Sequence, residues 1–230
     1  MQNIDAADFI SKLVIYMVVW LFAVSVHEAA HAWMSLKYGD DTAQRLGRVT
    51  LNPLAHIDPL GTLILPIIGF VASYSPQAAA FPLIMWGKPT PVNPLKWRKK
   101  DQANVMVSLA GIGTNIIVAI SVTIILRLLL YFGFFSFEAV RDNVAGPIFT
   151  LLVSMIVLNV GLAIFNLLPL PPLDGGKAIQ SFLPASSLPI MEMLETYGFL
   201  ILVLLMWTGL LGRIVGPIND LFIRILFIDL

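Results

Sequence analysis

VSVHEAAHAWMSLKYGD, residues 24–40, follows directly on the apolar run LVIYMVVWLFA, residues 13–23. The two stretches together predict one helix that begins in hydrocarbon and carries His27, Glu28 and His31 near its end. Gly39 then supplies a helix stop signal. Ionisable side chains cost free energy inside a bilayer, so three of them in such a helix indicate a functional site.

The composition of the chain is that of a membrane protein. Of its 230 residues, 58% are hydrophobic and only 12% are charged, whereas soluble domains carry about 25% charged residues. The 14 basic and 14 acidic residues balance, so the net charge indicates no nucleic-acid partner. The absence of cysteine excludes disulfides and thiolate metal ligands. The first residues, MQNIDAADFISK, lack the basic start of a cleavable signal peptide, so we expect the first apolar segment to be retained.

Long apolar runs predict an all-α polytopic membrane protein with about five or six transmembrane helices. Uncharged runs cover residues 105–126, 144–173 and 196–212, each near or above the ~20 residues that cross a bilayer. Residues 60–85 are also apolar, but they are broken by Pro66, Gly69, Pro76 and Pro82, which favours a re-entrant or broken segment.

We expect one membrane-embedded domain, residues 1–230, because no internal repeat or long polar linker divides the chain. Residues 42–58 mix strand-forming residues with Asn-Pro and Asp-Pro turn signals, which indicates a short hairpin or a β-like loop near the site. The expected elements are the HExxH helix at about 8–38, the hairpin or loop at 42–58, the re-entrant segment at 60–85, helices at about 103–133, 144–170 and 190–212, and a tail at 213–230 that lies in the interface or forms a short last helix.

The spacing of HEAAH suits a metal ion. Residues four apart lie on the same face of a helix, so His27 and His31 can present two imidazoles to one Zn²⁺. Glu28 then lies beside the metal, where its carboxylate can take a proton from water. A catalytic zinc has three protein ligands, so the third comes from His56 or from a carboxylate. Asp174 is the better candidate, because FNLLPLPPLDGGK, residues 165–177, unwinds a helix end and allows close backbone approach there.

The combination of HEAAH with NLLPLPPLDGG, residues 166–176, resembles the site-2 protease family of intramembrane zinc metalloproteases. The two motifs of that family are HExxH and N-x-x-P…L-D-G. The segment SLAGIGTN, residues 108–115, is similar to the A-G-P-x-x-N segment of the family, with Ile112 in place of the proline. The resemblance covers about residues 24–177 and is to the compact bacterial and archaeal members, which have no PDZ or CBS domain.

This resemblance implies a function and a role for each motif residue. His27, His31 and Asp174 would bind Zn²⁺. Glu28 would be the catalytic base, and Asn115 would be a catalytic residue that holds the substrate carbonyl or the oxyanion. The substrates would be membrane-anchored proteins, cleaved in or near a transmembrane segment within the lipid bilayer, in regulated intramembrane proteolysis.

Two other readings compete with a protease. A metal transporter or metal-binding membrane protein also places His and carboxylate in membrane helices, but it usually offers ligands along a path, whereas the ionisable groups here form one cluster. An inactive relative that only binds substrates is disfavoured because Glu28 and all three ligands are present. His56 more often caps a turn than binds a metal.

The two metal motifs also constrain the topology. Zinc bonds are about 2 Å long, so His31 and Asp174 lie at one membrane depth, each toward the end of its span. The chain between them therefore crosses the bilayer an even number of times, and residues 60–85 contribute no net crossing. The basic residues of the loop at 88–100 then predict that the site faces the cytoplasm, in the inner or plasma membrane of a prokaryotic cell.

Overall fold

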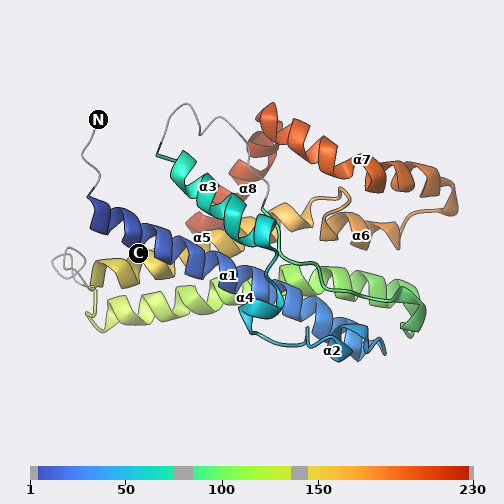
Figure 1. Ribbon diagram of the computed structural model, residues 1–230, viewed down its shortest axis with the longest axis horizontal. Helices are drawn as coiled ribbons and strands as arrows, with labels where there is room; N and C mark the ends of the chain where they lie inside the picture. The colour runs from blue at the N-terminus through green and yellow to red at the C-terminus, as the bar shows by residue number, and fades with distance from the viewer. Residues whose placement is uncertain (1–4, 75–84, 136–144, 228–230) are drawn as a thin grey trace.

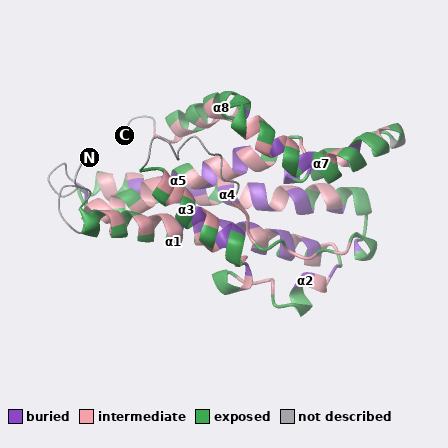
Figure 2. Ribbon diagram, turned by 45° about the horizontal axis from the view of Figure 1, so that its top comes forward, coloured by how far each residue is buried: buried purple, intermediate pink, exposed green. Residues whose placement is uncertain are grey.

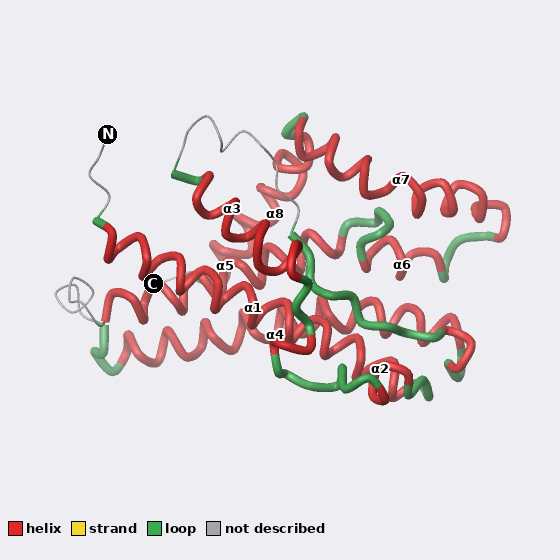
Figure 3. The backbone as a smooth tube through the Cα atoms, viewed as in Figure 1, coloured by secondary structure: helices red, strands yellow, loops and turns green. Residues whose placement is uncertain are grey.

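The computed structural model describes residues 5–74, 85–135 and 145–227, and all regular structure in these residues is helical (Figure 3). The shorter elements are single turns or brief helices between the long ones. The long helices are α1 Ala6–Lys37, α4 Lys100–Tyr131, α5 Ala145–Leu167, α7 Leu188–Trp207 and α8 Leu210–Leu226. The short elements are α2 Thr42–Arg45, α3 Leu65–Ala72, α6 Asp174–Gln180, a π-helical turn Pro59–Ile64, and 3₁₀ turns Pro53–Ala55, Pro94–Lys96 and Ala185–Ser187.

Four of the described helices, α1, α4, α5 and α7, are long and apolar enough to cross a membrane. The chain is therefore an all-α multi-pass membrane protein, which confirms the fold class that the sequence predicts. Four is fewer than the five or six spans expected. The apolar helix over Pro59–Ala72 is too short to count, and α8 has 17 residues interrupted by Arg213, Asp220 and Arg224.

The core lies where α1, α4 and α5 pack together (Figures 1 and 2). Leu126 of α4 and Ile156 of α5 are fully buried in one apolar cluster, and Trp20 of α1 is fully buried as well. α7 and α8 are largely exposed, as Figure 2 shows. In Figure 1, α1 and α5 run in one direction and α4 runs in the opposite direction. α1, which carries the two histidines, and α5, whose end leads to Asp174, are therefore parallel, as the sequence predicts for a shared metal ion.

The residues just before and just after the segment that contains α3 lie next to each other. The Lys88 N–H donates to the His56 carbonyl at 2.9 Å, so the two described ends of the segment lie side by side. Between them, α3 lies along the N-terminal half of α1, where the rings of Phe70 and Phe9 have centroids 5.4 Å apart. The re-entrant path that the sequence predicts for residues 60–85 would bring the two ends together in this way, and it stays a prediction. Residues 75–84 of the expected element lie outside the described residues.

Residues 42–58 take the loop form of the two that the sequence allows, and they contain no strand. Side chains that accept backbone N–H groups favour turns here over strand pairing. Asp40 accepts the Thr42 N–H at 3.0 Å at the start of α2. Asn52 accepts the Leu54 N–H at 3.1 Å at the start of the Pro53–Ala55 turn. The turn residues in this stretch therefore decide its form over the strand-forming ones.

Candidate metal centre

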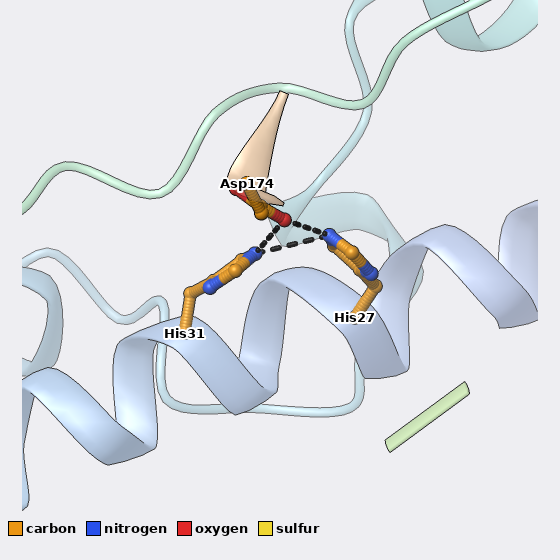
Figure 4. Close-up of side chains that lie close together, drawn as sticks. All are labelled: His27, His31 and Asp174. Atoms are coloured by element: carbon orange, nitrogen blue, oxygen red, sulfur yellow. Dashed lines mark hydrogen bonds and ion pairs between the residues drawn. The ribbon is translucent and has the colours of Figure 1, made fainter. Parts of the chain in front are cut away.

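Three buried donor atoms from distant parts of the chain meet at one point (Figure 4). His27 Nε2 and His31 Nε2, both on α1, each lie 3.0 Å from Oδ2 of Asp174, the first residue of α6. The two Nε2 atoms are also 3.0 Å apart. All three residues are at most 8% exposed. The structure thus brings together the three residues that the sequence predicts as metal ligands.

Two glycines set the position of Asp174. α5 ends at Leu167, and the proline-rich turn that follows leads into α6. A Cβ on Gly175 would lie 2.3 Å from the Leu167 carbonyl oxygen, and a Cβ on Gly176 would lie 2.3 Å from the Pro171 nitrogen. Only glycine permits these contacts, so the Gly-Gly pair presses the start of α6 against the end of α5. The carboxylate of Asp174 is thereby directed at α1.

The outer nitrogens of both imidazoles are held by acceptors. His31 Nδ1 lies 2.7 Å from the Val107 carbonyl oxygen, and His27 Nδ1 lies 3.2 Å from Asn115 Oδ1. A carbonyl oxygen can only accept, so each Nδ1 carries the hydrogen and donates it. In the neutral rings, both Nε2 atoms then present a lone pair to the centre. Metal-binding histidines are commonly oriented in this way, with the ring N–H that does not face the metal donated to a nearby acceptor.

The donor set fits a zinc ion. Three lone-pair acceptors, His27 Nε2, His31 Nε2 and Asp174 Oδ2, lie 3.0 Å apart in a buried site, and they repel one another unless a positive charge lies among them. A proton can bridge one pair, whereas a metal ion can bond all three. Two nitrogens and one carboxylate oxygen form a common three-ligand set for catalytic zinc. On the α4 side the backbone closes the site, because a Cβ on Gly111 would lie 2.6 Å from each Nε2.

Glu28 shares a cavity of about 640 Å³ with these three residues. Its Oε2 accepts the Thr90 N–H at 2.7 Å, and the Thr90 hydroxyl donates to the Glu28 carbonyl at 2.9 Å. The extended segment around Thr90 therefore lies across α1 and fixes one oxygen of the Glu28 carboxylate. Sequence analysis missed this contact, because Thr90 lies in a proline-rich loop without periodicity.

Two other residues singled out in the sequence lie away from the donor atoms. Asn115 is fully buried, lies behind His27 and does not line the cavity. Its Nδ2 is buried without a hydrogen-bond partner in the part of the chain that the structure describes. His56 is buried too, but its Nε2 lies 2.9 Å from the Thr50 carbonyl, and it does not belong to the donor group. Its contacts are those of a residue that fixes a turn.

Comparisons with known proteins give a consistent family. The model of peptidase family M50 matches residues 15–208. The chain is similar to YwhC of Bacillus subtilis (strain 168), which is named as a zinc metalloprotease, with 36% identity over 207 residues that cover 90% of this chain and 86% of YwhC. It is also similar to Rip2 of Mycolicibacterium smegmatis, likewise named as a zinc metalloprotease, with 27% identity over 92% of this chain and 74% of Rip2. No solved structure was found to match the chain.

Proposed function

The chain belongs to peptidase family M50, the site-2 protease family, and from that premise we propose that it is an intramembrane zinc protease that cleaves membrane-anchored proteins in or near their transmembrane segments. The observation that carries the proposal is the group of His27, His31 and Asp174 in one cavity with Glu28. A metal site alone would suit many functions. A carboxylate beside it, in a cavity large enough for a peptide, suits hydrolysis.

The ligand set in this proposal is His27 Nε2, His31 Nε2 and Asp174 Oδ2. Zinc, when bound there, supplies a Lewis acid that polarises the scissile carbonyl and makes water more acidic. Val107 and Asn115 accept from the outer nitrogens of the two rings and hold both lone pairs toward the centre. The role of Asn115 in this proposal is therefore to position His27. Keeping a buried Nδ2 without a partner is costly, at about 1–3 kcal/mol, which supports a functional reason for an asparagine here.

Glu28 moves the proton. Its carboxylate takes a proton from the attacking water and gives it to the leaving amide nitrogen. The Thr90 N–H holds Oε2, so the other oxygen, Oε1, is left for this transfer. The apolar side chains of Trp20, Val24 and Phe199 also line the cavity and suit a substrate segment that comes from the bilayer.

A metal transporter is the competing proposal. It needs successive sites along a path, whereas the described residues contain a single group of His, Asp and Glu side chains that could hold an ion. It also has no use for a carboxylate held beside the metal. Both observations favour the enzyme.

A Glu28→Gln variant tests the proposal. Gln keeps the size of the side chain and its hydrogen bond to Thr90 but cannot take the water proton at neutral pH. Membrane-protein fragments are compared by proteomics in cells that make the intact chain and in cells that make the variant. We expect fragments that vanish with Glu28→Gln while the purified variant keeps one zinc per chain. Unchanged fragments together with retained metal flux would support the transporter.

We also propose that the metal centre opens to the cytoplasm of a prokaryotic cell, across its plasma membrane. Lys96, Arg98 and Lys99 precede α4 and Lys100 begins it, and such basic stretches lie on the cytoplasmic side. Single cysteines at Asp41 and Lys99 of this cysteine-free chain test the orientation. Both positions are expected to react with an impermeant thiol reagent in inverted vesicles only. Reaction from opposite faces would refute the shared side, and reaction of both in intact cells would reverse the orientation.

A further inference from the structure

The cavity beside the metal centre holds a single basic side chain. Among the described residues that line it, Lys177 is the only lysine or arginine. Its Nζ lies 3.0 Å from Asp174 Oδ1, while Asp174 Oδ2 faces the two histidines. One carboxylate group therefore separates the ammonium of Lys177 from the donor atoms that would hold the metal.

The backbone around Lys177 is held in place from α4. Asn104 Nδ2 donates to the Lys177 carbonyl at 2.8 Å and to Ser181 Oγ at 2.9 Å, which fixes α6 against α4. The Lys177 side chain itself is 51% exposed. An ammonium has three N–H donors, and Asp174 occupies one of them. Two donors remain for a group that enters the cavity.

Peptide hydrolysis needs such donors. Water oxygen bonds to the carbonyl carbon, the carbonyl π pair moves to oxygen, and the water proton goes to Glu28. An electron pair of that oxygen then re-forms the C=O bond as the C–N bond breaks, and the C–N electron pair and the proton from Glu28 go to nitrogen. Negative charge develops on the carbonyl oxygen in the first step, and a preorganised donor aimed at it contributes about 10²–10³ to the rate. Asn115 does not supply it from its position behind His27.

We propose that Lys177 is the catalytic residue that stabilises this oxyanion. It rests on the proposed protease function and adds a residue that the sequence motifs do not include. The ammonium, which lines the same cavity as Glu28, donates its two remaining N–H groups to the carbonyl oxygen as charge develops. If Lys177 only anchored Asp174, its loss would act through the affinity for the metal. It would not weaken one ligand of the bound metal more than the other.

The test uses purified full-length protein loaded with Co²⁺ and two ligands with the same Leu-Trp dipeptide. N-phosphoryl-Leu-Trp places a tetrahedral anion at the metal, and a hydroxamate of the same dipeptide binds the metal without one. Affinities are read from the Co²⁺ absorption spectrum for the intact chain, Lys177→Met and Lys177→Arg. Met removes the charge at similar length, whereas Arg retains it. Affinity for Zn²⁺ is measured separately by competition with a chelator.

We expect Lys177→Met to lower the affinity for N-phosphoryl-Leu-Trp by about 10²-fold or more. A loss of this size is in line with the loss of one oxyanion donor. Hydroxamate affinity of the Co²⁺-loaded protein is expected to stay within twofold, and Lys177→Arg is expected to recover most of the phosphoryl affinity. Zn²⁺ affinity is expected to fall by up to about 10–100-fold in Lys177→Met, because Asp174 Oδ1 loses its partner. An equal loss of affinity for both ligands, or no loss of affinity for N-phosphoryl-Leu-Trp, would overturn the proposal. These outcomes are independent of the Glu28→Gln experiment, whose failure would remove the protease function itself.

Discussion

Asp40 and Asp174 are both buried carboxylates, and what surrounds them differs completely. Asp40 is 0% exposed and accepts hydrogen bonds from Ser35 Oγ at 2.9 Å, Thr42 N at 3.0 Å and Asn93 N at 2.7 Å. Asp174 instead directs Oδ2 at two histidine nitrogens that carry lone pairs. Hydrogen-bond donors surround the carboxylate of Asp40, whereas Oδ2 of Asp174 faces two lone pairs and only its Oδ1 has a donor, Lys177 Nζ at 3.0 Å. The hydrogen bonds of Asp40 are complete without a ligand, whereas Oδ2 of Asp174 and the two histidine nitrogens need a cation among them.

Asp40 joins three parts of the chain. Ser35 lies on α1, Thr42 begins α2, and Asn93 lies in the loop before α4. Burial by itself would raise the pKa of the Asp40 carboxyl, but the hydrogen bonds from Thr42, Asn93 and Ser35 outweigh it and hold that pKa below its ordinary value. The carboxylate is therefore stable as an anion, and its role is to hold the loop that carries Thr90.

The largest effect that separates the two carboxylates is on metal content. Asp174→Ala removes one of three donors and is expected to weaken Zn²⁺ binding by more than the roughly 10–100-fold that loss of an outer partner costs. Asp40→Ala and His56→Ala are expected to keep about one zinc per chain, because neither residue reaches the donor group. The zinc content of the three purified variants tests this assignment of the metal ligands. Zinc retained in Asp174→Ala, or lost in His56→Ala, would overturn the ligand set.

Gly111 of α4 tests how closely the two imidazoles at Asp174 must be held. A Cβ there would lie 2.5 Å from His27 Cε1 and 2.6 Å from His31 Nε2, so Gly111→Ala pushes both rings out of place. We expect its Zn²⁺ affinity to fall by about 10–100-fold, as for a lost orienting partner. Gly113→Ala is the matched control, because nothing lies within 4 Å of a Cβ on Gly113. That variant should bind zinc normally and gain up to about 1 kcal/mol of helix stability.

The sequence predicts one of these two carboxylates and misses the other, for a physical reason. The positions of His27 and His31 follow from helix geometry, and Asp174 follows a proline-rich turn with two glycines, so local rules reach all three. The role of Asp40 depends on Asn93, 53 residues further along a loop without periodicity. Thr90 and Glu28 are likewise 62 residues apart. Long apolar runs predict helices, but contacts made by extended loops depend on the complete fold.

Asp40→Asn tests whether donors alone hold the first carboxylate. An amide NH₂ would replace one acceptor oxygen and face a donor, so we expect a loss of about 1–3 kcal/mol in unfolding free energy. The low pKa of Asp40 means that its contribution is complete above the unfolded value of about 3.9 and disappears as the pH falls through the lower folded value. Thermal unfolding of the zinc-free proteins in detergent should show the full difference at pH 7 and a smaller one near pH 3. A difference that grows in acid would contradict the assignment.

The smallest expected effect on the unfolding free energy is that of Lys96. A Lys96 variant tests whether a nearby charge or the hydrogen bonds stabilise the Asp40 carboxylate. Its Nζ lies 3.9 Å from Asp40 Oδ1 and 2.7 Å from Asp41 Oδ1, and its side chain is 40% exposed. Exposed ion pairs contribute about 0.2–1 kcal/mol, and salt screens them. We therefore expect Lys96→Met to lower the unfolding free energy by less than Asp40→Asn does, with a difference from the intact chain that shrinks between low and high salt. If Lys96→Met lowers the unfolding free energy as much as Asp40→Asn does, the charge of Lys96 stabilises the buried carboxylate. The hydrogen-bond donors around Asp40 would then not be enough to stabilise it.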